Sequence, residues 1–282
     1  MGLATFKGGI HPYEGKELSE NKPIQVLLPK GELVFPMSQH IGAPAKPLVA
    51  KGDRVLAGQK IGEAGGFISA NVICSVSGTV KGIEPRLMAN GSMVQSIIVE
   101  NDGEYRTVEG FGQKRDYTAL SKQEIRDIVK EAGIVGLGGA GFPTNVKLAP
   151  KNEEEIDYVI VNGAECEPYL TSDYRVMLEQ PEKVVGGLKV ILQLFDKAKG
   201  VIGIEENKPE AIRILSELVK DEPRIQVCTL KTKYPQGGER FLIYAVTGGR
   251  EINSTMLPAD AGCIVDNIDT VVSIYNAVCE TT

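Results

Sequence analysis

The sequence predicts an all-β domain followed by an open α/β domain. Between residues 24 and 108, short apolar segments are separated by Gly, Pro, Asn and Asp turn signals, without helical patterns between them. From about residue 119 onward, buried strand patterns alternate with helix patterns. A chain of 282 residues has room for about two domains. We place them at residues 1–110 and 111–282.

Four segments of the first region have the composition of strands: residues 24–28, 54–56, 78–81 and 94–99. Strands at such short intervals indicate a small barrel or sandwich. More specifically, residues 51–62 and 75–80 resemble the two halves of a biotinyl/lipoyl-type barrel-sandwich hybrid. Carrier members of that group bear their prosthetic group on a lysine at an exposed hairpin tip. Residues 64–74 contain no lysine, so we expect the fold without the swinging-arm function.

A glycine-rich segment at residues 136–144 follows a predicted helix. Ser121 and Glu124 form a capping-box pattern, and apolar residues continue at helical spacing to Ala132. Glycines at four of the six positions 136–141 let the main chain approach a flat, phosphorylated ligand. Pro143 suits the first turn of a helix whose free N–H groups attract an anion. Because a helix precedes it, the segment differs from the Rossmann dinucleotide fingerprint. A plain glycine-rich turn is the alternative.

Three strands, at residues 158–161, 201–204 and 225–230, and three helices, at residues 181–195, 209–219 and 237–246, are predicted for the α/β region. Ligands of such sheets bind beyond the carboxyl ends of the strands. Polar segments follow the three strands, at residues 162–168, 205–207 and 234–239. Their carboxylates are candidates for binding ribose hydroxyls or a carboxamide. The alternative is a favourable charge at a helix N-terminus, which stays open above all for Glu205 and Glu206.

The composition excludes several classes of function. A net charge of −6 argues against nonspecific nucleic-acid binding. No apolar run approaches the ~20 residues that span a bilayer, and we expect no transmembrane segment. Five scattered cysteines without a C-x-x-C pair indicate reduced thiols in the cytoplasm, with neither a zinc nor an iron–sulfur motif. Two histidines leave few acid–base catalysts.

Four motifs of the second region resemble, in the same order, the flavin-binding subunit of respiratory complex I. They lie at residues 136–147, 162–168, 234–239 and 266–270. Residues 5–12 and 38–47 resemble RnfC, the peripheral subunit of a membrane ferredoxin:NAD oxidoreductase that couples electron flow to ion transport. The resemblance implies a Rossmann-like α/β domain of the complex I flavin-subunit type behind a barrel-sandwich hybrid domain.

The resemblance to these two families also implies the cofactors and partners. FMN and NAD(H) are the expected cofactors, with hydride passing directly between nicotinamide and flavin. The partners are the other subunits of an Rnf-type complex on the cytoplasmic face of the cell membrane. No side-chain acid or base and no metal ligand is implied.

Thirteen residues are carried over by position as cofactor contacts. Of these, Phe142, Glu167 and Glu239 are implied to contact NAD(H). The full set is Gly136, Gly138, Gly139, Gly141, Phe142, Lys147, Asn162, Glu165, Glu167, Gly238, Glu239, Asp266 and Asn267.

The sequence departs from the related motifs at three places. Leu137 occupies the position of an arginine, Gly238 that of a glutamate, and residues 250–258 lack a lysine implied near NADH. RnfC relatives continue into a further β domain and two four-cysteine motifs. We therefore expect the chain to be part of a longer protein, with [4Fe-4S] clusters only beyond residue 282. Two alternatives stay open: a docking or quinone-binding module without flavin, and a subunit of a soluble reductase.

Overall fold

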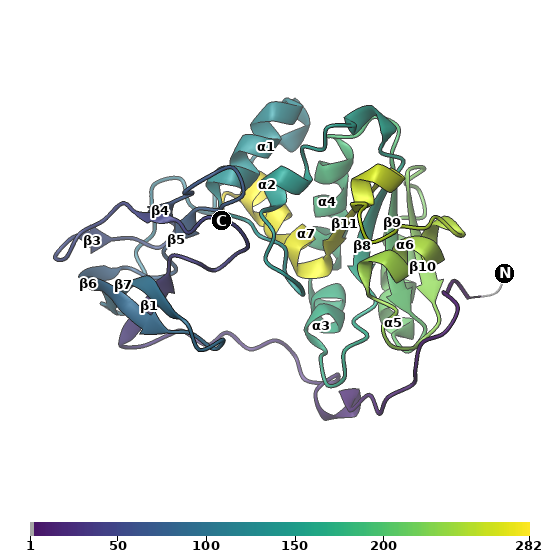
Figure 1. Cartoon of the computed structure of the whole chain (residues 1–282), viewed down its shortest axis with the longest axis horizontal. Coiled ribbons are helices and arrows are strands. Elements are labelled where there is room, and N and C mark those ends of the chain that lie inside the picture. Colours follow the sequence, from purple (N-terminus) through teal and green to yellow (C-terminus); the bar gives the residue numbers. More distant parts are fainter. Residues whose placement is uncertain (1–2) are drawn as a thin grey trace. The chain divides into compact units, whose positions relative to one another are not determined.

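Figure 1 shows the computed structural model of the chain, which describes residues 3–282. These residues form two compact units. The first comprises residues 3–25 and 148–275, and the second comprises residues 26–147 and 276–282. Each unit therefore combines two separate stretches of the chain. The domain boundary predicted at residue 110 stays a prediction.

A four-stranded parallel sheet forms the centre of the first unit. Its strand order is β10-β9-β8-β11, with all neighbouring pairs parallel. The strands are β8 (Tyr158–Gly163), β9 (Lys199–Glu205), β10 (Ile225–Leu230) and β11 (Cys263–Asn267). The three predicted strands are confirmed. β11 was not predicted, because its apolar run is only three residues long before Asp266.

Helices cover both faces of this sheet. A Cβ atom at Gly200 of β9 would meet Leu188, whereas one at Gly203 would meet Leu242. Residues three apart in a strand point to opposite faces, so the helices that carry these two leucines lie on opposite sides. The first side has α3 (Ser172–Glu179), α4 (Pro181–Leu192), α5 (Pro209–Leu218) and α7 (Ile268–Tyr275), which pack against one another. The other side has α6 (Glu239–Thr247). The three predicted helices correspond to α4, α5 and α6 and are confirmed. Short 3-10 turns complete the unit: η1 (Lys16–Leu18), η3 (Glu153–Glu155) and η4 (Pro258–Ala261).

The second unit contains two antiparallel sheets. One has the order β1-β7-β6-β3 and the other the order β2-β4-β5. Their strands are β1 (Glu32–Pro36), β2 (Lys46–Pro47), β3 (Arg54–Val55), β4 (Lys60–Glu63), β5 (Val72–Ile73), β6 (Gly78–Leu87) and β7 (Met93–Asn101). Both sheets contribute to one apolar core, which includes Phe35, Val55, Ile61, Val72 and Ile97. The strands predicted at residues 54–56, 78–81 and 94–99 are confirmed.

The strand predicted at residues 24–28 is wrong. The segment has no regular structure, and Val26 and Leu27 are 87% and 90% exposed. Pro23 and Pro29 flank it and cannot donate to a strand ladder. The N–H of Ile24 donates instead to the carboxylate of Glu179, at 3.0 Å.

The second unit contains four short helical segments, of which the first two precede the glycine-rich segment. They are η2 (Tyr117–Ala119), α1 (Lys122–Glu131), α2 (Thr144–Lys147) and the π-helical η5 (Asn276–Glu280). The predicted capping box is confirmed, since Ser121 and Glu124 cap the N-terminus of α1 reciprocally. The helix expected after Pro143 has only four residues. Its macrodipole therefore adds little to any anion site, because so few peptide dipoles are aligned.

We predict that Gly187→Ala destabilises the first unit. A Cβ atom there would lie 2.2 Å from the main-chain oxygen of Val271, where α4 meets α7. The overlap with backbone should lower the free energy of unfolding by about 1–3 kcal/mol, although alanine is the better helix former. Urea denaturation measures the effect. In Gly82→Ala, whose Cβ would meet nothing within 4 Å, the change should stay within about 0.5 kcal/mol. Equal stability of the two variants would contradict this packing.

Candidate functional site

Two of the predicted motifs meet at the carboxyl edge of the parallel sheet. The side-chain amide of Asn162 donates to the carbonyl of Gly237 at 2.8 Å, and the N–H of Gly237 donates to the sulfur of Cys166 at 3.2 Å. A Cβ atom at Gly237 would lie 3.3 Å from atoms of Ala164, Asn162 and Cys166. The peptide at Gly237 is thus enclosed by the segment that follows β8. Only a residue without a side chain fits this close approach readily.

The motif at the end of β11 is linked to the segment after β8 through Asp173, a residue that the sequence analysis did not identify. Asn267 donates to the carboxylate of Asp173 at 2.7 Å, and the N–H of Asp173 donates to Glu165 at 2.7 Å. Glu165 also accepts from the N–H of Tyr174 at 3.4 Å, so its carboxylate lies at the N-terminus of α3. Asp266 is 1% exposed at the end of β11. Three of the four predicted motifs therefore converge within the first unit.

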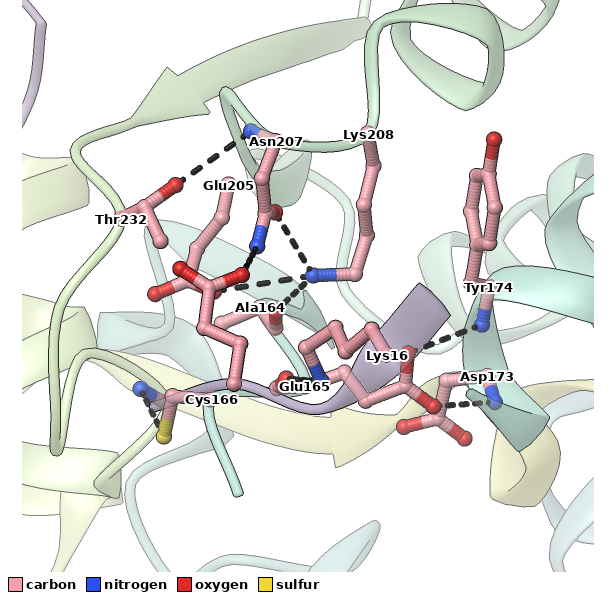
Figure 2. A network of polar contacts seen from close by, with 12 residues as sticks. Lys16, Ala164, Glu165, Cys166, Asp173, Tyr174, Glu205, Asn207, Lys208 and Thr232 are labelled. Carbon is pink, nitrogen blue, oxygen red and sulfur yellow. Dashed lines mark hydrogen bonds and ion pairs between the residues drawn. The ribbon is translucent and has the colours of Figure 1, made fainter. Parts of the chain in front are cut away.

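Two buried lysines lie beside this edge (Figure 2). Lys208 is 1% exposed and its ammonium donates to the carbonyl of Ala164 at 2.7 Å and to the Asn207 side chain at 3.0 Å. It also lies 3.6 Å from the carboxylate of Glu205. Lys16 is 6% exposed and donates to main-chain oxygens of the segment after β8. The sequence did not point to either lysine, because the carbonyls that they bind in the segment after β8 lie far away in the chain.

Burial dominates the electrostatics of these groups. It raises the pKa of Glu165 to about 7, with the charge of Asp173 adding to the effect and Lys208 and Lys16 opposing it. Burial likewise raises the pKa of Asp173 to about 6, against the stabilising hydrogen bond from Asn267. Burial also raises the pKa of Glu205 and lowers the pKa of Lys208, although the two attract each other. The edge thus contains carboxyl groups that change charge near neutral pH.

The second glycine-rich motif differs from the related one for a steric reason. Gly238 is the N-cap of α6, and a Cβ atom there would lie 3.0 Å from the ring of Phe241 and 3.1 Å from the carbonyl oxygen of Pro235. The glutamate of the complex I motif would therefore be crowded at this position. Glu239, the next residue, is exposed at the first position of α6.

In the second unit, the segment at residues 136–142 forms a closed loop. The N–H of Gly136 donates to the carbonyl of Phe142 at 2.8 Å, while Gly138 and Gly141 have left-handed φ angles of 72° and 65°. A Cβ atom at Gly139 would meet nothing within 4 Å. One at Gly136 would lie 4.0 Å from the ammonium of Lys147. The loop therefore presents bare main chain with a cation beside it.

The barrel-sandwich region supports this loop. The N–H of Ile41 donates to the carbonyl of Gly141 at 3.2 Å, and His40 accepts from the N–H of Ala70 at 3.1 Å. Asn71 donates at 3.3 Å to the carbonyls of Lys130 and of the residue after it, at the end of α1. The hairpin tip at residues 64–71, which bears the lysine in carrier proteins, here contacts the end of α1 and the segment at residues 40–41 that binds the glycine loop.

The predicted residues form two groups. Six lie in the second unit: Gly136, Gly138, Gly139, Gly141, Phe142 and Lys147. Seven lie in the first: Asn162, Glu165, Glu167, Gly238, Glu239, Asp266 and Asn267. The structure brings the members together within each unit. A common ligand for both groups is a proposal.

Several features fit a phosphorylated flavin. Open space at Gly139 leaves room for a flat ligand, and Lys147 with the loop N–H groups suits phosphate. Two buried donors, the hydroxyl of Thr144 and the amide nitrogen of Gln236, have no hydrogen-bond partner among the described residues. Buried donors of this kind are normally satisfied, and both adjoin glycine-rich motifs. Each of them, in its own unit, is a donor that an acceptor atom of a ligand would satisfy.

A pocket in the first unit is not itself a nucleotide site. Its lining includes Lys16, Cys166, Glu205 and Tyr234. Its enclosed volume is about 10 Å³, which is room for about one water molecule. In residues 3–282, no group of three or more His, Cys, Asp or Glu is placed to hold a metal ion.

Two family models match the chain. The one described as the Nuo51 FMN-binding domain matches residues 129–276, and the one described as the RnfC barrel sandwich hybrid domain matches residues 4–104. The resemblance to RnfC and to the complex I flavin subunit is thereby confirmed, as is the order of an all-β region before an α/β region. None of the helices described combines the length and apolar character needed to span a bilayer.

Relatives match over almost the whole chain. One is a subunit of the proton-translocating ferredoxin:NAD(+) oxidoreductase complex of Clostridium ljungdahlii, 45% identical over 276 residues, which are 98% of this chain and 60% of that protein. The corresponding subunit of the Na(+)-translocating complex of Acetobacterium woodii is 47% identical over 273 residues, 96% of this chain and 61% of that protein. The chain spans about 60% of the length of these relatives.

A solved structure shares part of the fold. The NAD+-reducing [NiFe]-hydrogenase in the air-oxidized state matches with a TM-score of 0.52 and 23% identity, over 59% of this chain and 31% of the hydrogenase chain. At this identity the match supports the fold alone.

We predict that Glu165→Gln flattens the dependence of stability on pH. The pKa of Glu165 in the folded chain, about 7, lies above its ordinary value of 4.5. Its stabilising contribution is therefore fully present below about pH 4.5 and is lost as the pH rises through 7. Glutamine stays neutral and can still accept a hydrogen bond from the N–H of Asp173. The variant should therefore avoid a decrease of up to about 3 kcal/mol in the free energy of unfolding at pH 8.

Urea denaturation of wild type and Glu165→Gln at pH 5 and pH 8 measures this difference. Glu206→Gln, at an exposed position, is the control and should follow the wild type. An identical slope for wild type and Glu165→Gln would show that Glu165 does not titrate in this range.

Proposed function

The chain belongs to the family of the Nuo51 FMN-binding domain, and on this premise we propose that it binds FMN and NAD(H) and allows hydride transfer between them. Its relatives are named as subunits of ion-translocating ferredoxin:NAD(+) oxidoreductase complexes. We propose the corresponding role for this chain, as part of a peripheral subunit at the cytoplasmic face of the membrane. Its partners are the other subunits of such a complex.

The open main chain at Gly139, with Lys147 close to Gly136, is the observation that carries the proposal. Backbone N–H groups and one ammonium hold a phosphate without a long cationic surface. That explains how a chain with a net charge of −6 binds an anionic cofactor. FMN, when bound, supplies both hydride transfer and single-electron transfer.

The other residues then bind and orient the ligands. Asn162, Glu165, Gly238, Asp266 and Asn267 are proposed to contact FMN together with Gly136, Gly138, Gly139, Gly141 and Lys147. Phe142, Glu167 and Glu239 are proposed to contact NAD(H). The finer fold assignment follows the same reasoning: a Rossmann-like sheet binds its ligands beyond the carboxyl ends of the strands. No side-chain base is needed, because the cofactors carry the chemistry.

Reconstitution tests the proposal directly. The purified chain incubated with FMN and freed of excess cofactor should keep the visible absorbance of a flavin, and NADH should bleach it. A chain that retains FMN without bleaching would lack the NADH half of the site. A chain that binds neither would favour a docking module.

We predict that Gly139→Val abolishes FMN binding without unfolding the chain. The Cβ of the valine would meet no atom within 4 Å beyond the adjacent residues, and Gly139 does not have a left-handed φ angle. It would instead fill the space assigned to the flavin. Retained FMN is measured by absorbance after gel filtration, and circular dichroism checks folding. Gly82→Val, also in open space, should bind FMN like the wild type. FMN binding by Gly139→Val would refute the assignment of this loop.

A further inference from the structure

Residues 4–10 run beside the end of β10 and the segment that follows it, at the carboxyl edge of the parallel sheet. Ala4 forms a parallel bridge with Leu230, and Ile10 forms an antiparallel bridge with Tyr234. We call residues 4–25 the N-terminal strap. The family model for the barrel matches from residue 4, yet the strap belongs to the first unit with the α/β sheet. Its contacts therefore bear on the candidate site.

The ammonium group of Lys16, in the strap, binds the loop at residues 165–170. It donates to the carbonyl oxygens of Glu165 at 2.8 Å, Glu167 at 3.1 Å and Leu170 at 2.7 Å. An ammonium has three N–H donors, so every donor of Lys16 has an acceptor in this loop. With the side chain 6% exposed, water does not compete freely for these bonds. All three N–H donors of Lys16 therefore stabilise the backbone conformation of residues 165–170.

The loop needs such an external support. Glu165 and Tyr169 have left-handed φ angles of 50° and 67°, which are costly for residues with a side chain. The strap supplies further contacts: the carbonyl of Glu14 accepts from the N–H of Tyr169 at 2.7 Å. Gly15 has no room for a side chain, because a Cβ atom would lie 2.4 Å from the ring of Tyr169. The backbone strain is thus held in place by the strap.

Figure 2 shows how the two buried lysines divide this task. Lys208 binds the carbonyl of Ala164, and Lys16 binds the carbonyl of the next residue, Glu165. Ser19 and Thr171 share a hydrogen bond of 2.9 Å at the far end of the loop. Glu167 lies in the middle and is exposed. The hydroxyl of Tyr234 hydrogen-bonds to its carboxylate, and its backbone is fixed on both sides.

We infer that Lys16 is a positioning residue for the nucleotide site: it fixes the 165–170 loop so that Glu167 meets NAD(H). The inference rests on the proposed function, in which Glu167 contacts the dinucleotide. Lys16 itself contacts no ligand. Its effect on NAD(H) passes through the backbone of Glu167. Lys16 also binds the carbonyl of Glu165, a proposed FMN contact, but the carboxylate of Glu165 keeps its bonds to the N–H groups of Asp173 and Tyr174. NAD(H) affinity should therefore change more than FMN affinity.

The test uses Lys16→Met, which keeps the length of the side chain and removes its charge and donors. Three main-chain carbonyls, that of Glu165 buried, would lose their partner, so the loop should open and NADH should bind about 10- to 100-fold more weakly to the FMN-loaded chain. FMN affinity should change less than about threefold. Calorimetric titration with NADH and with FMN measures both. Lys7→Met, an exposed lysine of the same strap, is the matched control and should bind NADH like the wild type.

A double-mutant cycle separates positioning from general destabilisation. If Lys16 acts through Glu167, the NADH affinities of Lys16→Met, Glu167→Gln and the double variant should be strongly non-additive. Additive losses, or equal losses of NADH and FMN affinity, would overturn the inference. So would a Lys16→Met variant with unchanged NADH affinity.

Hydrogen exchange of the ligand-free chain provides a readout that needs no cofactor. Amides of residues 165–171 should exchange faster in Lys16→Met, while those of β8 and β9 stay protected. Unchanged exchange at residues 165–171 would show that Lys16 does not fix this loop. If the wild type binds no NADH, the proposed function fails together with the nucleotide role of Lys16. Faster exchange in Lys16→Met would then still show that Lys16 fixes the 165–170 loop.

Discussion

Two buried ammonium groups determine the shape of the loops at the carboxyl edge of the parallel sheet. Lys208 and Lys16 bind the carbonyls of Ala164 and Glu165, which are consecutive in the chain. Burial of a lysine is costly unless its charge and all its donors are satisfied. Main-chain oxygens and nearby carboxylates satisfy both groups here. The Gly237 turn and the Asp173–Asn267 contact are built upon the loop that these lysines hold.

The two groups of candidate residues have complementary electrostatics. The glycine loop offers N–H groups and Lys147, whereas the sheet edge offers carboxyl groups. Burial raises the pKa of Glu165 to about 7 and that of Asp173 to about 6, so these groups exchange protons near neutral pH. A nicotinamide gains positive charge when it gives up hydride, and neighbouring acids can compensate for such a change.

Local patterns in the sequence predicted much of the fold. β10 and the cap of α1 follow directly from an apolar run and from the Ser121–Glu124 pair. The prediction of a strand at residues 24–28 failed, because composition alone cannot show that a strand has no partner. Three of the four motifs were found to converge within one unit, which chain order and the parallel-sheet rule anticipate. Lys16, Asp173 and Lys208 were missed, because contacts such as that between Lys16 and Glu165, 149 residues apart, leave no periodic or spacing signal.

The division of the chain into four stretches bears on its synthesis. Residues 3–25 leave the ribosome well before their partners in the first unit, which lie at residues 148–275. At ordinary rates of translation, the strap waits roughly ten seconds to a minute before the last of these emerges. The second unit is likewise incomplete until residues 276–282 arrive. The first unit can therefore finish folding only once residue 275 has been made, and the second only after residues 276–282 follow. The strap therefore stays without its partners throughout the synthesis of the barrel and most of the parallel sheet, and its apolar residues Ile10 and Leu18 remain exposed even in the folded unit.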